Sequence, residues 1–156
     1  MSSNLFRIYR SSAGSGKTRT LAKEYIKLAL QYDPYYFRHI LAVTFTNKST
    51  QEMKQRILYY LNEFALGKVN DLSSEIQDEL GLTREQLVEK SKSAQSAILH
   101  HYSQFSISTI DAFFQRVIRS FTREAGLLGN FRLEVENDIV LRDVIEELMD
   151  ELGEKT

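Results

Sequence analysis

A short segment near the amino terminus has the residue types and spacing that can bind a polyphosphate. Its residues are Ser12, Ala13, Gly14, Ser15, Gly16, Lys17 and Thr18. Gly14 and Gly16 let the backbone turn its N–H groups toward an anion and leave no Cβ in the way. A lysine can then neutralise the β- and γ-phosphates of a nucleotide, and the adjacent hydroxyl can bind Mg²⁺. The segment therefore predicts a site for ATP and magnesium, with the catalytic roles on Lys17 and Thr18.

The neighbouring elements favour this interpretation, although the strict phosphate-loop pattern has glycine where Ser11 stands. Residues 5–9 are short, apolar and β-prone, so they predict a strand that ends at the loop. Residues 17–31 carry apolar side chains at helical spacing and predict a helix that begins inside it. The alternative is a Gly/Ser turn followed by an ordinary helix with an exposed lysine.

A second polar segment follows the continuous apolar run at residues 40–45. A run of this kind is typical of a parallel strand that is buried on both faces. Ser49 and Glu52 have the spacing of a capping box and predict the start of the next helix. Apolar residues then recur at helical spacing over residues 53–64, which predicts that one face of this helix packs into the core.

The rest of the chain continues to alternate between helices and strands. Residues 67–81 predict at most one short helix, and Thr83 with Gln86 predicts a second capping box, with a helix to about residue 102. A strand is expected at 105–109, and Asp111 is expected to cap the helix after it. Beyond that helix the pattern predicts three further elements, namely a turn at 126–130, a strand at 131–135 and an amphipathic helix at 140–152.

This alternation predicts one α/β domain with a mainly parallel sheet. Ligands of such sheets bind beyond the carboxyl ends of the strands. Both polar segments, residues 10–17 and 44–48, directly follow predicted strands. We therefore expect the two segments to form one functional edge.

Three motifs together resemble those of superfamily 1 DNA helicases of the UvrD/Rep type. Residues 12–19 resemble motif I, residues 43–53 are similar to motif Ia, and residues 108–113 resemble motif Ib. Their order and wide spacing are most similar to the RecB/AddA branch, the motor subunits of recombination helicase–nucleases. The resemblance implies a P-loop (RecA-like) parallel sheet flanked by helices. Residues 1–156 would be the incomplete N-terminal part of helicase domain 1A with a helical insertion.

The resemblance also implies roles for single residues. Arg19 would contact the nucleotide, and motif Ia would lie under single-stranded DNA, where Phe45 can stack on a base. The residues implied to bind DNA are Thr44, Phe45, Thr46, Asn47, Lys48 and Thr109. Without the resemblance, Phe45 would be the last core residue of its strand and Lys48 a solvated charge. Asp111 stands where the family usually has histidine, and its charge would repel a phosphate, so no DNA contact is assigned to it.

The chain lacks a strand that ends in the acidic pair needed for efficient ATP hydrolysis. The near match at residues 148–151 has helical periodicity. We therefore expect this chain to be a fragment that binds ATP without efficient turnover. An incomplete sheet would expose an edge through which a homodimer can form, and the parent protein would have a nuclease or helicase partner subunit. The alternatives are a small-molecule or nucleotide kinase and a non-catalytic nucleotide-binding scaffold.

Length and composition restrict the class of protein to which the chain can belong. The chain has 156 residues, 42% of them hydrophobic and 26% charged, with a net charge of −1. This balance suits one globular domain and does not by itself indicate a nucleic-acid binder. No cysteine is present, which excludes disulfides and thiolate metal sites and favours a cytoplasmic protein. No apolar run approaches the roughly 18 residues of a membrane span, and we expect no signal peptide.

Overall fold

A computed structural model describes residues 8–9 and 16–124 of the chain. The predicted loop residues Ser12 to Ser15 lie outside the described residues, as do the elements predicted beyond residue 125 and the acidic near match at 148–151. Residues 8–9, at the end of the first predicted strand, have no regular secondary structure. The chain divides into two compact units, 1–110 and 111–156, and each is described by itself.

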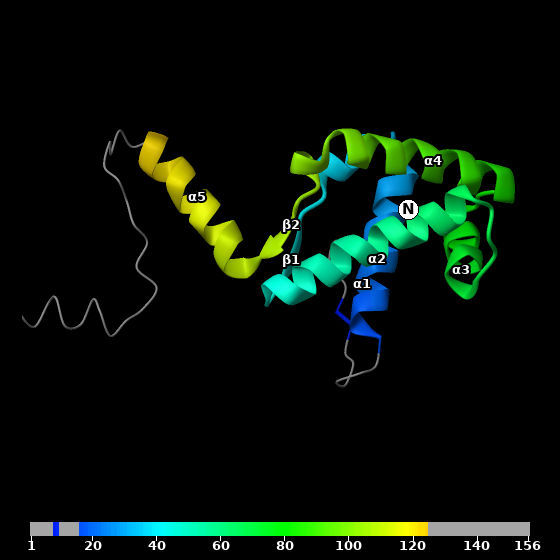
Figure 1. The fold of residues 1–156 in the computed structure, drawn as a ribbon, viewed down its shortest axis with the longest axis horizontal. Coiled ribbons are helices and arrows are strands. Elements are labelled where there is room, and N and C mark those ends of the chain that lie inside the picture. Colours follow the sequence, from blue (N-terminus) through cyan, green and yellow to red (C-terminus); the bar gives the residue numbers. More distant parts are fainter. Residues whose placement is uncertain (1–7, 10–15, 125–156) are drawn as a thin grey trace, which may run out of the picture. The chain divides into compact units, whose positions relative to one another are not determined.

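The first unit is mostly helical and holds a small parallel sheet (Figure 1). In chain order its elements are α1 (Lys17–Gln31), η1 (Tyr36–His39), β1 (Ala42–Thr44), α2 (Asn47–Ala65), α3 (Asp71–Leu80), α4 (Arg84–His100), η2 (Tyr102–Gln104) and β2 (Ile107–Thr109). Helix α4 lies along α2, and α1 packs against both of them. The described part of the second unit belongs to α5 (Ile110–Glu124).

The two strands pair in parallel, with Ala42 opposite Ile107 and Thr44 opposite Thr109. Parallel pairing confirms that part of the predicted α/β arrangement. Parallel strands need a long crossover between them, and here it consists of α2, α3 and α4. The register brings the carboxyl ends of β1 and β2 to the same edge of the sheet.

The core lies between α1, α2 and α4, with α3 packed against α1. The predicted core face of α2 is confirmed, because Met53, Ile57, Leu61 and Phe64 are all buried. On α1 the predicted apolar residues are buried except Leu21, which is 49% exposed. The largest fully buried apolar side chains are Phe37, Phe64, Phe105, Ile26, Leu30, Ile57, Leu61, Leu72, Ile76 and Ile98. The ring of Tyr25 meets that of Phe105 edge-on at 5.6 Å, which ties α1 to the segment entering β2. Burial raises the pKa of the Tyr25 hydroxyl.

Of the three predicted helix caps, one is confirmed and two are wrong. The capping box at the start of α4 forms, because Thr83 Oγ1 accepts from the Gln86 N–H while Gln86 Oε1 accepts from the Thr83 N–H. Helix α2 begins earlier than predicted, because the extended Thr46 caps it by accepting from the Ser49 N–H at 3.1 Å. Asp111 lies in the first turn of α5, where its carboxylate favours the helix dipole without being the cap residue.

The prediction that β1 is buried on both faces is also wrong. Val43 is 44% exposed, whereas its neighbours Ala42 and Thr44 are half-buried. Helix α2 packs against the strand and covers one face, and the side chains that alternate to the other face keep contact with solvent. Among residues 16–124, no helix is long and apolar enough to cross a membrane.

Candidate functional site

Helix α1 starts from a backbone conformation that suits glycine. Gly16 has φ 83° and ψ 16°, in the left-handed region where an L-residue costs about 1–2 kcal/mol. Its carbonyl accepts the N–H of Thr20 at 3.0 Å and closes the first helical turn. Lys17, the first residue of α1, is exposed, and Thr18 is half-buried. The described residues that were predicted to hold phosphate are therefore presented at a helix N-terminus.

The first turn of α1 has the electrostatics of an anion site. It contains no acidic residue, and no side-chain cap is seen among the described residues. The first N–H groups of a helix have no partner inside it and carry a partial positive charge. Thr18 carries a hydroxyl of the kind that can ligate Mg²⁺, an ion that usually keeps few protein ligands and takes the rest from phosphate and water. The described residues contain no cluster of three His, Asp or Glu side chains that could hold a metal.

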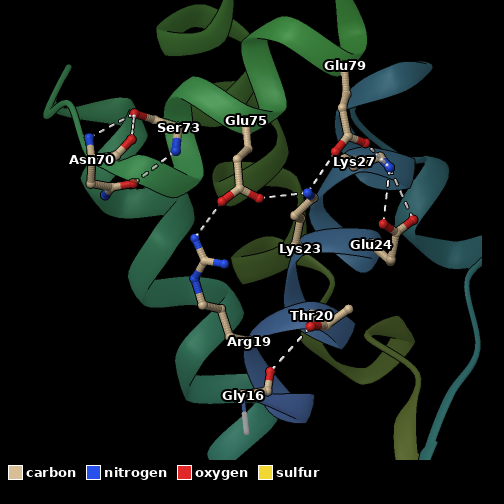
Figure 2. Close-up of polar contacts among 10 residues, drawn as sticks. All are labelled: Gly16, Arg19, Thr20, Lys23, Glu24, Lys27, Asn70, Ser73, Glu75 and Glu79. Carbon is tan, nitrogen blue, oxygen red and sulfur yellow. Dashed lines mark hydrogen bonds and ion pairs between the residues drawn. The ribbon is translucent and has the colours of Figure 1, made fainter. Parts of the chain in front are cut away.

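Arg19, the residue implied to contact the nucleotide, is bound to α3 in this structure (Figure 2). Its Nη2 atom donates to Oε1 of Glu75 at 2.8 Å. Lys23 Nζ lies 2.7 Å from Glu75 Oε2 and 2.6 Å from Glu79 Oε1, and Lys27 pairs with Glu79 as well. We call these five residues the α1–α3 ladder. Hydrogen bonds from Lys23 and Arg19 lower the pKa of Glu75 to about 2, and those from Lys23 and Lys27 lower the pKa of Glu79.

The carboxyl end of the sheet gathers the predicted DNA residues of β1 and β2. Thr44 and Thr109 are register partners, and the hydroxyls of Thr44 and Thr50 lie 2.6 Å apart. Phe45 follows β1 directly and is 86% exposed. The alternative in which Phe45 is a core residue is therefore wrong. An exposed phenylalanine at this edge is a surface on which a base can stack.

The residues after Phe45 form the first turn of α2. Thr46 uses its hydroxyl to cap the helix, with Ser49 Oγ at 2.9 Å. Asn47 and Lys48 are exposed, and the first turn contains no acidic side chain. The amino ends of α1 and α2 therefore have the same charge character, and both suit phosphate groups.

Sequence reasoning missed the two carboxylates of the α1–α3 ladder. Arg19, Lys23 and Lys27 recur every fourth residue on α1, and Glu75 and Glu79 have the same spacing on α3. Residues four apart share one face of a helix, so this spacing was the available signal. It could not show that the two faces meet, because residues 67–81 gave only a weak helix prediction.

Comparison with known proteins identifies the family. Residues 7–156 match the UvrD/REP helicase N-terminal domain. The chain belongs to this family. Its relatives include an ATP-dependent helicase/nuclease subunit from Bacillus cytotoxicus, which is 30% identical over 144 residues, or 90% of this chain. The protein of the same description from Bacillus cereus strain AH820 is 33% identical over the same share of the chain.

The UvrD/REP match confirms the resemblance drawn from the three motifs. The chain spans 10% of the length of these two relatives. No solved structure shows a significant match to it. The family match shows a helicase N-terminal domain. Its described elements are mostly helical with a two-stranded parallel sheet, which is consistent with the RecA-like fold implied by the resemblance.

Proposed function

We propose that this chain is the ATP-binding part of an ATP-dependent DNA helicase or translocase of the helicase–nuclease type. Mg-ATP binds at residues 12–18, where Lys17 neutralises the β- and γ-phosphates and Thr18 contributes a hydroxyl to Mg²⁺. The start of α1 carries this proposal. A left-handed Gly16, an exposed Lys17 and a first turn without acidic residues suit a polyphosphate.

Single-stranded DNA binds at the carboxyl end of the sheet. A base stacks on Phe45, which is 86% exposed, and phosphates approach the first turn of α2 at Asn47 and Lys48. Thr44, Thr46 and Thr109 complete this track with short polar side chains. A strand of nucleic acid bound here would follow the edge that β1 and β2 share.

The parent protein works with a partner protein, since each of the two relatives is described as one subunit of a helicase/nuclease. We expect this chain alone to bind nucleotide without efficient turnover, because neither of the two strands described within residues 16–124 ends in an acidic pair. The two-stranded sheet described within residues 16–124 has strand edges through which homodimers of the isolated chain can form. The chain is expected in the cytoplasm, where its nucleotide and DNA ligands are available.

A titration of the 156-residue chain with a fluorescent ATP analogue and Mg²⁺ tests the nucleotide site. Lys17→Ala should weaken binding by about 1.5–3 kcal/mol, the value of a hydrogen bond to a charged group, or roughly 10- to 150-fold. Lys92→Ala is the matched control, since Lys92 is an exposed lysine of α4 that belongs to neither proposed phosphate site. Equal affinity of wild type and Lys17→Ala would favour the non-catalytic scaffold instead. Phosphate transfer to a small acceptor would favour the kinase, which UvrD/REP membership argues against.

A further inference from the structure

The α1–α3 ladder connects the proposed nucleotide site to the helices inserted between the two strands. Arg19 lies three residues after Gly16, which is about 4.5 Å of helix rise. It is thus in the turn that presents Lys17 and Thr18, yet its guanidinium is held by Glu75 of α3 (Figure 2). In that view the Arg19 side chain extends toward Glu75 and away from Gly16. The structure therefore shows an arginine of the first turn of α1 already bound to a carboxylate.

The contact between Arg19 and Glu75 is open to solvent. Their side chains are 40% and 37% exposed, so water reaches both partners and neither charge is trapped in the core. Glu75 retains a second cation when Arg19 leaves, because Lys23 donates to its other oxygen at 2.7 Å. Releasing Arg19 therefore does not strand an unpaired carboxylate. A guanidinium freed in this turn is well suited to phosphate, which it binds with two parallel N–H donors.

We propose that Arg19 exchanges Glu75 for the bound nucleotide, so that Glu75 of α3 is a positioning residue that competes with nucleotide for this arginine. The inference rests on the proposed function, since it requires a nucleotide at the amino end of α1. Nucleotide binding then weakens the attachment of α3 to α1, so the local stability of α3 depends on whether the nucleotide site is occupied. By thermodynamic reciprocity, the factor by which bound nucleotide weakens the Arg19–Glu75 contact equals the factor by which this contact weakens nucleotide binding, so a change that breaks this contact must raise nucleotide affinity.

Glu79 provides a matched control for this proposal. Like Glu75 it is a partly exposed carboxylate of α3 that pairs with two cations of α1, but its partners are Lys23 and Lys27. Glu75→Gln and Glu79→Gln make the same change in net charge and each weaken two ion pairs. Only the first frees Arg19. A difference between them in nucleotide affinity therefore isolates the exchange from general electrostatics and from loss of stability.

The test is a titration of the whole chain with a fluorescent ATP analogue in the presence of Mg²⁺, with folding checked by circular dichroism. Glu75→Gln should bind the analogue about two- to fivefold more tightly than Glu79→Gln, the range that an exposed ion pair can supply. In an Arg19→Ala background, the two glutamine substitutions should have equal effects. Amide exchange over residues 71–80 should quicken when Mg-ATP is added to wild type and stay unchanged in Arg19→Ala.

Each alternative result has a defined meaning. If Glu75→Gln and Glu79→Gln bind equally, or if Glu75→Gln binds more weakly, the competition is refuted while the nucleotide site stands. If the difference persists without Arg19, the effect belongs to the carboxylate alone and the exchange is again refuted. If wild type binds no analogue, or binds it as well as Lys17→Ala does, the proposed function fails and this inference fails with it.

Discussion

Phe45 gives the sharpest test of the nucleic-acid site, because the core and DNA-binding interpretations predict opposite results for Phe45→Ala. The side chain is 86% exposed, so its removal loses little packing and should change the free energy of unfolding by less than about 0.5 kcal/mol. A fully buried phenylalanine such as Phe64 would cost about 3–5 kcal/mol on the same substitution. Stacking of a base on Phe45 is worth about 1–3 kcal/mol, which corresponds to a loss of affinity of roughly 5- to 150-fold.

The assay is fluorescence anisotropy of a labelled oligothymidine, measured at constant salt with wild type, Phe45→Ala and Tyr59→Ala. Tyr59 is an aromatic residue that is 58% exposed on α2 and lies outside the proposed track, so its substitution controls for the loss of an exposed ring. Urea unfolding of the same proteins measures stability. A normal affinity for Phe45→Ala, or a loss no larger than that of Tyr59→Ala, would refute the stacking role.

Two further predictions concern stability. Ser91 Oγ lies in α4 and is the one buried side-chain nitrogen or oxygen atom without a hydrogen-bond partner among the described residues. In urea unfolding, Ser91→Ala should therefore stabilise the chain by about 1–2 kcal/mol more than Ser93→Ala does. Ser93 is the control because it is exposed in the same helix. A smaller gain at Ser91 than at Ser93 would mean that this hydroxyl is hydrogen-bonded. The lowered pKa of Glu75, about 2, means that its ion pairs stabilise the fold above about pH 5 and are lost as the pH falls toward 2. Because Glu75 is partly exposed, Glu75→Gln should reduce the change in the free energy of unfolding between pH 5 and pH 2 by no more than about 1 kcal/mol. If the free energy of unfolding of Glu75→Gln depends on pH as that of wild type does, the pairing is contradicted.

The helical faces could be predicted from the sequence because their signal is local. Ile57, Leu61 and Phe64 repeat at the spacing of one helical face, and that face is buried. Thr83 and Gln86 form the capping box that their spacing indicates, since a cap depends only on residues of the same turn. The three motifs predicted the family for a different reason: they occur together, in a fixed order.

The remaining features depend on contacts between distant segments. Periodicity could not show that the run ending at Phe45 is open to solvent on one face, because that is decided by which elements pack against β1. The start of α2 was misplaced because Thr46 and Ser49 both carry hydroxyls able to cap a helix, and only the backbone conformation of Thr46 decides between them. The pairing of Arg19 with Glu75 joins residues 56 positions apart, beyond the reach of any sequence window.

The order in which this unit assembles follows from its parallel pair of strands. No tight hairpin can join β1 to β2, so their ladder closes only after the chain between Thr44 and Ile107 has collapsed. The entropy lost on closing the long segment between β1 and β2 opposes early pairing of the strands. Helices α2 and α4 are closer in sequence, so they can pack their apolar faces against each other before the strands pair. We infer that the α2–α4 pair forms early in folding and that the strand ladder forms late. Substitutions in the interface between α2 and α4 should therefore slow folding, and substitutions in β1 should mainly speed unfolding.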